Sequence, residues 1–119
     1  MSTKEGFTSP VAVAAKIIGS KWKILILDAL LKKAPLRFTQ LKEAIPDISK
    51  KVLTECLRAL EQDGIITRQA FHEVPPRVEY SLSEQGKGLD NVFSAMQEWG
   101  KGYISGDPVR KPWWRIFRR

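Results

Sequence analysis

The residues best suited to binding chemistry lie within one stretch, Ile48–Gly64. Ammonium and guanidinium groups bind phosphate, and hydroxyl groups hydrogen-bond to phosphate or to the edges of bases. At about 100° per residue, these polar side chains fall on one side of a helix and the apolar ones on the other. The outward side carries Lys50, Lys51, Thr54 and Arg58, and the inward side carries Val52, Leu53, Cys56, Leu57 and Leu60. This pattern suits a helix inserted into a DNA groove, although an ordinary amphipathic helix with a solvated basic face shows it too.

Catalytic and metal-binding chemistry has little support in the sequence. The one cysteine, Cys56, excludes an intramolecular disulfide and a thiolate cluster, and the one histidine, His72, leaves little for imidazole ligation. No glycine-rich phosphate loop and no nucleophile spaced from a base is recognisable. We therefore predict no catalytic residue, no metal, no cofactor and no enzymatic activity.

The length of 119 residues predicts one domain. The net charge of +7 is unevenly distributed along the chain. Residues 107–119 contain five basic residues and one acidic residue, which leaves only +3 for the remainder. We predict a domain over 1–106 followed by a basic, tryptophan-rich tail over 107–119. The tail could touch acidic lipid, stack on nucleic acid or fold onto the dimer, or it could be a mobile basic terminus that adds non-specific affinity for DNA. The absence of a signal-peptide pattern predicts a cytoplasmic protein, associated with the nucleoid if it binds DNA.

The elements that must position the basic stretch are short helices. Ser9 followed by Pro10 predicts a capped helix start. The periodicity then predicts helices over residues 11–18, 21–31, 40–45 (with Thr39 as its cap) and 49–63, and a very short strand at 36–37. A short helix, a tight turn and a longer helix with an outward basic face have helix-turn-helix spacing.

The hydrophobic period changes after Gly64. Residues 65–71 and 77–82 alternate as strands do, and Pro75–Pro76 between them predicts a stiff hairpin tip. A hairpin that follows a helix-turn-helix is a wing, here residues 66–82, and Arg77 in it is placed to reach a phosphate or the minor groove. The fold class is therefore predicted as mainly α (α+β), a winged helix-turn-helix with added N- and C-terminal dimerisation helices.

The terminal helices predict a homodimer. The first is apolar nearly all round, and the last, predicted from Ser83–Glu84 past Gly86 and Gly88 to about Tyr103, carries a continuous apolar stripe. Packing against a second copy would cover both, whereas a monomer that packs them onto its own core remains the alternative. The predicted interface residues are Val11, Ala14, Ala15, Ile18, Leu89, Val92, Phe93, Met96, Trp99 and Tyr103.

Collinear motifs from about Ser9 to Gly102 resemble the HxlR-type family of bacterial and archaeal winged helix-turn-helix transcriptional regulators. They include Gly19-Ser20-Lys21-Trp22, Leu36-Arg37-Phe38-Thr39, Ile48-Ser49-Lys50-Lys51-Val52 and Pro75-Pro76-Arg77-Val78-Glu79-Tyr80. The resemblance implies a homodimer on a two-fold symmetric operator, and it implies that Arg37 and Arg77 lie near the DNA backbone or minor groove. The DNA-binding residues are thus predicted as Arg37, Ser49, Lys50, Lys51, Thr54, Arg58 and Arg77. The small size of the domain favours repression.

Two positions depart from the family pattern. Some members sense electrophiles or oxidants through a cysteine before the first Pro-Val, where this chain has Ser9, whose hydroxyl cannot act as a thiolate. Cys56 stands where many relatives carry arginine. It is predicted to be a buried small residue, with a relocated redox sensor as the alternative. A small-molecule effector in an apolar pocket between the first and last helices is a further alternative.

Overall fold

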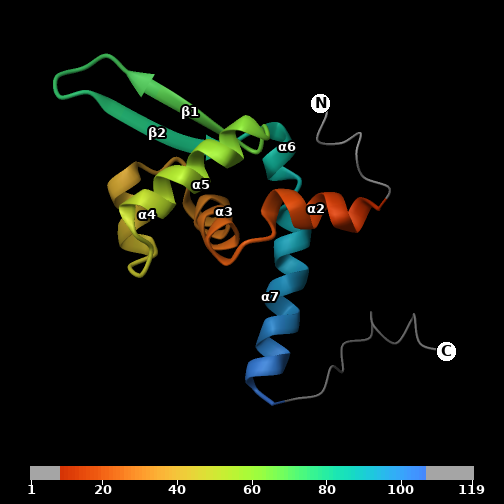
Figure 1. The fold of residues 1–119 in the computed structure, drawn as a ribbon. Coiled ribbons are helices and arrows are strands. Elements are labelled where there is room, and N and C mark those ends of the chain that lie inside the picture. The colour runs from red at the N-terminus through yellow and green to blue at the C-terminus, as the bar shows by residue number, and fades with distance from the viewer. Residues whose placement is uncertain (1–8, 107–119) are drawn as a thin grey trace. The chain divides into compact units, whose positions relative to one another are not determined.

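The computed structural model describes residues 9–106, which form six helices and a two-stranded antiparallel sheet (Figure 1). The elements in order are α2 (Pro10–Ile18), α3 (Lys21–Lys33), α4 (Phe38–Ala44), α5 (Lys50–Gln62), β1 (Ile66–Phe71), β2 (Arg77–Leu82), α6 (Glu84–Lys87) and α7 (Asp90–Ile104). This order confirms the predicted winged helix-turn-helix. The described residues divide between Lys87 and Gly88 into two compact units, each considered by itself below. The predicted tail, 107–119, lies outside the described residues.

Three helices begin at serine caps. The Oγ atom of Ser9 accepts a hydrogen bond from the Ala12 amide, and Ser20 and Ser49 act in the same way at α3 and α5. Each cap satisfies one amide that the first helical turn leaves without a partner, which stabilises the helix by about 1 kcal/mol. The predicted cap Ser9 is confirmed, and Ser49 is the cap of α5 rather than its first helical residue.

The start of α4 differs from the prediction. Thr39 is not its cap, because the helix already begins at Phe38 and Arg37 occupies the N-cap position. The Gln40 side chain folds back instead, and its Oε1 accepts a hydrogen bond from the Arg37 amide at 2.8 Å. This glutamine, three residues after the cap, satisfies the amide of the cap residue itself, whereas a threonine cap would accept from an amide within the first helical turn.

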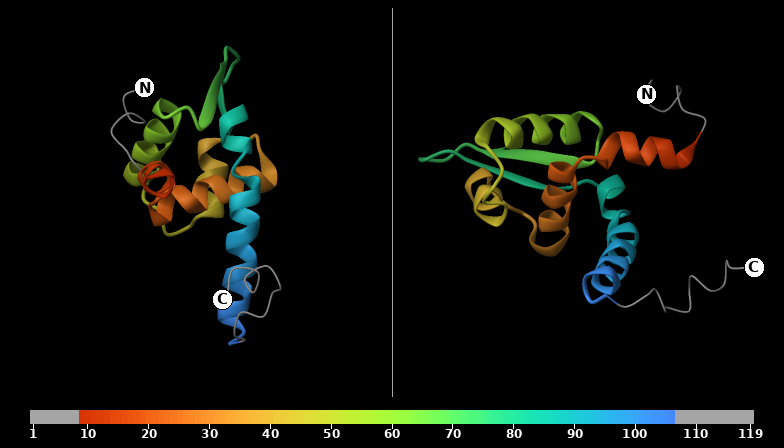
Figure 2. Two further views of the ribbon diagram at one scale, coloured as in Figure 1. Left: turned by 90° about the vertical axis from the view of Figure 1, so that its right-hand side faces the viewer. Right: turned by 60° about the horizontal axis from the view of Figure 1, so that its bottom comes forward.

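The core of the first unit lies between the helices and the hairpin. α3 packs against α5 and β2, and α5 runs alongside β1 (Figure 1; Figure 2, right). Leu36 joins the sheet through an isolated bridge to Tyr80, with N–O distances of 3.0 and 2.8 Å, as expected for a very short strand. The most deeply buried large side chains are Ile26, Leu27, Leu30, Leu41, Ile48, Leu53 and Leu60.

Two glycines fix the connections around the hairpin. Gly64, which ends α5, has a φ of +77°, a left-handed conformation that favours glycine. Gly86 lies against the Ile65 carbonyl, so a Cβ at this position would collide with that oxygen. Nearby, the Ser83 hydroxyl donates to the Gly64 carbonyl oxygen at 2.6 Å, which ties the end of β2 to the α5–β1 turn.

The prediction of one long final helix is wrong. The segment is divided into the four-residue α6 and the 15-residue α7, with Gly88 and Leu89 between them. Gly86 and Gly88 lose more conformational freedom in a helix than other residues, by about 1 kcal/mol each relative to alanine, and this weakens the helix where the break occurs. The apolar stripe predicted from residue 89 onward therefore lies on a helix of its own.

No helix within residues 9–106 has the length and apolar character needed to cross a bilayer.

Candidate nucleic-acid interface

The outward side of α5 carries the predicted basic face. Lys50, Lys51 and Arg58 are exposed, and Thr54 is partly exposed. Ser49 is also exposed, but its Oγ atom already accepts from the Val52 amide at 3.0 Å. Ser49 therefore acts first as the helix cap, while its hydroxyl proton stays available to a phosphate or base oxygen.

The orientation of this face follows from what lies beneath it. Leu53 and Leu60 are fully buried, Leu57 is 3% exposed, and Cys56 is 9% exposed on the same side of α5. Rotating α5 to hide the lysines would expose these side chains, and each leucine would lose about 1.5–3 kcal/mol of burial free energy. The apolar side thus keeps the basic side turned toward solvent.

The turn between α4 and α5 is also anchored from within. Ile45 and Ile48 are 6% and 1% exposed, and the Ile48 amide donates to the Ile45 carbonyl at 3.1 Å. Arg37 lies exposed at the start of α4, one helix before α5. The helix-turn-helix therefore presents the start of α5 from a fixed turn.

Arg77 is engaged within the hairpin. Its guanidinium lies 3.9 Å from the centre of the Phe71 ring and forms ion pairs with Glu73 at 3.0 Å and Glu79 at 3.8 Å. Its Nε atom is buried without a hydrogen-bond partner among the described residues, and the side chain is only 26% exposed. The charge predicted to meet DNA is thus balanced by two carboxylates.

The strand register explains why Arg77 lies apart from α5. Ile66 pairs with Leu82, and both are buried beneath the helices. Side chains alternate along a strand, so the Arg68–Tyr80 pair shares that face, whereas the Phe71–Arg77 pair lies on the opposite one.

Arg68 is a basic residue that the sequence analysis missed. It is exposed, and together with Thr54 and Arg58 it lines a groove between α5 and the hairpin. The signal was present in the sequence, because Arg68 lies two residues after the apolar Ile66 and so faces the same side of the strand.

Cys56 has the surroundings of a buried structural residue. Burial raises the pKa of its thiol above the ordinary value, the Lys23 charge opposes this rise, and the Glu55 charge adds to it. The thiolate is the reactive form of cysteine, so a raised pKa lowers the reactivity of Cys56 near neutral pH. These surroundings disfavour Cys56 as a redox sensor.

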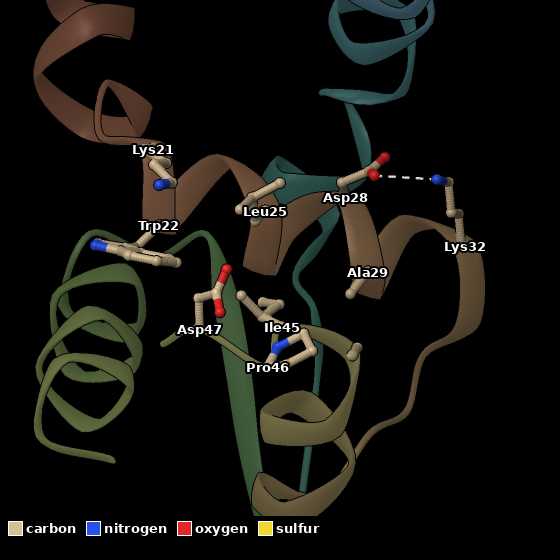
Figure 3. Close-up of a pocket in the computed structure, with 10 residues that line it drawn as sticks. Lys21, Trp22, Leu25, Asp28, Ala29, Lys32, Ile45, Pro46 and Asp47 are labelled. Carbon is tan, nitrogen blue, oxygen red and sulfur yellow. Dashed lines mark hydrogen bonds and ion pairs between the residues drawn. The ribbon is translucent and has the colours of Figure 1, made fainter. Parts of the chain in front are cut away.

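An apolar groove of about 330 Å³ lies between α3 and the α4–α5 turn (Figure 3). Trp22 and Leu25 line it from α3, and Pro46 lines it from the turn. The alternative of an effector pocket concerned the first and last helices, whereas this groove is lined by residues of the first unit alone. Within residues 9–106 no cluster of histidine, cysteine, aspartate or glutamate could hold a metal ion.

The residues predicted at a dimer interface differ in exposure. In α2, Val11 is 78% exposed and Ile18 is buried, while Ala14 and Ala15 are exposed. Leu89, just before α7, is half-buried, and Phe93 within α7 is buried. The α7 side chains of Val92, Met96, Trp99 and Tyr103 are 44%, 43%, 51% and 73% exposed. Trp99 and Tyr103 stack with ring centroids 5.3 Å apart. Both helices therefore present apolar side chains to solvent.

Comparison with known proteins supports the helix-turn-helix assignment of α4 and α5. Residues 17–108 match the model of the HxlR-like helix-turn-helix family. A transcriptional regulator of the helix-turn-helix type from Methanothermobacter thermautotrophicus is 48% identical over 95 residues, which are 80% of this chain and 72% of that protein.

Two solved structures share the fold at substantial sequence identity. The regulator YtcD has a TM-score of 0.78 and 41% identity, with 82% of this chain and 99% of that chain covered. The redox regulator HypR in its oxidized form has a TM-score of 0.74 and 39% identity, with 79% and 96% covered.

Proposed function

Because the chain belongs to the HxlR-like helix-turn-helix family, we propose that it is a transcriptional regulator that binds double-stranded DNA through α5. The observation that carries this proposal is the division of α5 into a buried apolar side and an outward side with Lys50, Lys51, Thr54 and Arg58. A helix held in this way can enter the major groove, where its first turn reaches base edges and its later turns reach phosphate. Its relatives are regulators rather than enzymes.

The remaining DNA contacts follow from position. Ser49 and Arg37 are exposed at the starts of α5 and α4, where phosphate contacts commonly position a helix-turn-helix. Arg77 acts chiefly within the hairpin, because a phosphate would have to compete with Glu73 and Glu79 for its charge.

The chain acts as a homodimer on a two-fold symmetric site. The exposed apolar side chains of α2 and α7 support this, since burying each large one against a second copy would gain about 1.5–3 kcal/mol. Repression is the mode of action, because occupying an operator needs only a DNA-binding surface. The cytoplasm, where the chromosome of a bacterium or archaeon lies, is its place of action.

The test is selection of duplexes from a random library with the full chain, followed by titration of the selected DNA at several salt concentrations. We expect an inverted repeat, and we expect Lys51→Ala to lower affinity and to reduce the salt slope by about one unit. Lys87→Ala is the matched control, because it removes one exposed lysine outside α5. Selection that returns no enriched sequence would contradict the proposal.

A further inference from the structure

A groove of about 360 Å³ separates the recognition helix α5 from the hairpin. Leu57 at 3% exposure, with the half-buried Phe38 and Tyr80, forms its apolar part. Its polar part comes from two elements. Thr54, Arg58 and Glu61 line it from α5, and Arg68 lines it from β1.

The two arginines are fixed on opposite sides of this groove by regular structure. Thr54, Arg58 and Glu61 are spaced four and three residues apart, so they follow one side of α5. Arg68 is the register partner of Tyr80, whose backbone is held by both hydrogen bonds of the Leu36 bridge. The hairpin therefore cannot turn Arg68 away without breaking its own ladder.

Both guanidinium groups are available to a ligand. The ion pairs found within residues 9–106 join Lys32 to Asp28, Arg77 to Glu73 and Glu79, and Lys87 to Glu84. None includes Arg58, Arg68 or Glu61. Two free guanidiniums facing one groove match the charge and the fork geometry of a phosphate.

The geometry of duplex DNA says which phosphate would lie there. A sugar–phosphate strand separates the major groove from the minor groove. If α5 enters the major groove and the hairpin lies toward the adjacent minor groove, that strand must pass between α5 and the hairpin. The groove lined by Arg58 and Arg68 occupies this position.

We propose that this groove holds a backbone phosphate of the DNA between Arg58 and Arg68, with Glu61 as an opposing charge that limits affinity. The proposal rests on DNA binding by α5 and extends it to a phosphate site that includes β1. Glu61 repels the same phosphate that the arginines attract, so it weakens binding to every sequence equally. Correct base contacts are then needed for tight binding.

The experiment measures the affinity of the full chain for a selected duplex and for an unrelated duplex, between low and physiological salt. We expect Arg68→Ala to weaken binding to both duplexes by a similar factor, and to reduce the salt slope by about one unit. Glu61→Gln should tighten binding to both severalfold. Lys87→Ala removes one positive charge outside the groove, as Arg68→Ala does within it, and should leave the affinity for both duplexes unchanged.

Arg68 and Glu61 are exposed, so both substitutions should leave the fold intact, and thermal unfolding checks this. If Lys51→Ala weakens binding while Arg68→Ala leaves affinity and salt slope unchanged, the phosphate site is wrong and DNA binding by α5 stands. If Glu61→Gln leaves binding unchanged or weakens it, the opposing role of Glu61 is wrong. If the unaltered chain prefers no duplex, both the phosphate site and the proposed sequence-specific DNA binding are wrong.

Discussion

Helices α5 and α7 are both amphipathic, but their apolar sides have different surroundings. In α5, Leu53, Leu57 and Leu60 are at most 3% exposed, because α3 and β1 pack against this helix within the same unit. In α7, Val92, Met96 and Trp99 are 43–51% exposed and Tyr103 is 73% exposed. The apolar side of α5 is thus buried inside the fold, whereas most of the apolar side of α7 remains in contact with solvent.

This difference separates two uses of the same sequence pattern. A buried apolar side fixes the direction of the opposite side, so α5 can present its basic residues in one orientation. An exposed apolar side gains its free energy only when another surface covers it. The comparison therefore supports the proposed roles, which are positioning of the DNA-binding face for α5 and association for α7. The substitutions below test these two roles.

The largest expected effect is on the buried side of α5. Leu60→Ala should lower the free energy of unfolding by about 2–5 kcal/mol, because it removes buried methyl groups and leaves a cavity in the core. Denaturant titration followed by circular dichroism measures this loss. Glu55→Ala, on the exposed side of the same helix, is the matched control and should change stability by less than about 0.5 kcal/mol.

The second effect should fall on association rather than on folding. Trp99→Ala should weaken the homodimer by about 2 kcal/mol or more, since large aromatic side chains dominate interfaces and this one also stacks on Tyr103. Sedimentation equilibrium over a range of protein concentrations would show this as a shift toward monomer. Gln97→Ala, an exposed polar change on α7, should leave the dissociation constant unchanged. An equal shift in both variants would argue against the apolar stripe as the interface.

The smallest effect concerns Cys56, on the inner edge of α5. Its thiol has a raised pKa in the folded state, so folding favours the neutral form. The resulting stability is complete below the ordinary thiol pKa of about 8.5 and declines as the pH rises above it. The unfolding free energy of the wild type should therefore fall with alkaline pH slightly more steeply than that of Cys56→Ala, which cannot titrate.

Oxidation gives a second measurement on the same residue. Near neutral pH a thiol-specific oxidant should leave DNA affinity unchanged, because the buried neutral thiol reacts slowly. Loss of affinity in the wild type, but not in Cys56→Ala, would show that Cys56 is a sensor after all.

The two faces of the hairpin give a second comparison, between Arg68 and Arg77. Arg68 and Arg77 lie on strands of equal length, and both have the residue type expected of a DNA contact. The register places Arg68 beside α5, and it places Arg77 on the other face against Phe71, Glu73 and Glu79. Arg77 was predicted from its place in the wing and from the family resemblance, whereas strand alternation points to Arg68.

Local pattern in the sequence was enough for the elements and for the outward face of α5. Period, serine caps and the glycine after α5 depend on neighbouring residues, so helix 50–62 and the hairpin could be predicted within a residue or two. The same local patterns did not predict the start of α4 or the break at Gly88 between α6 and α7, where several weak preferences compete.

The tertiary structure alone decided which charges remain free and which apolar groups remain exposed. Within residues 9–106, Arg77 forms ion pairs with two carboxylates and Arg68 forms none, because ion pairs and ring contacts depend on which side chains the strand register brings together. The pKa of the Cys56 thiol is raised because the packing of α5 removes water from it. The chain sequence thus determined a basic helix with a wing, and the packing of distant residues determined which of its groups can act.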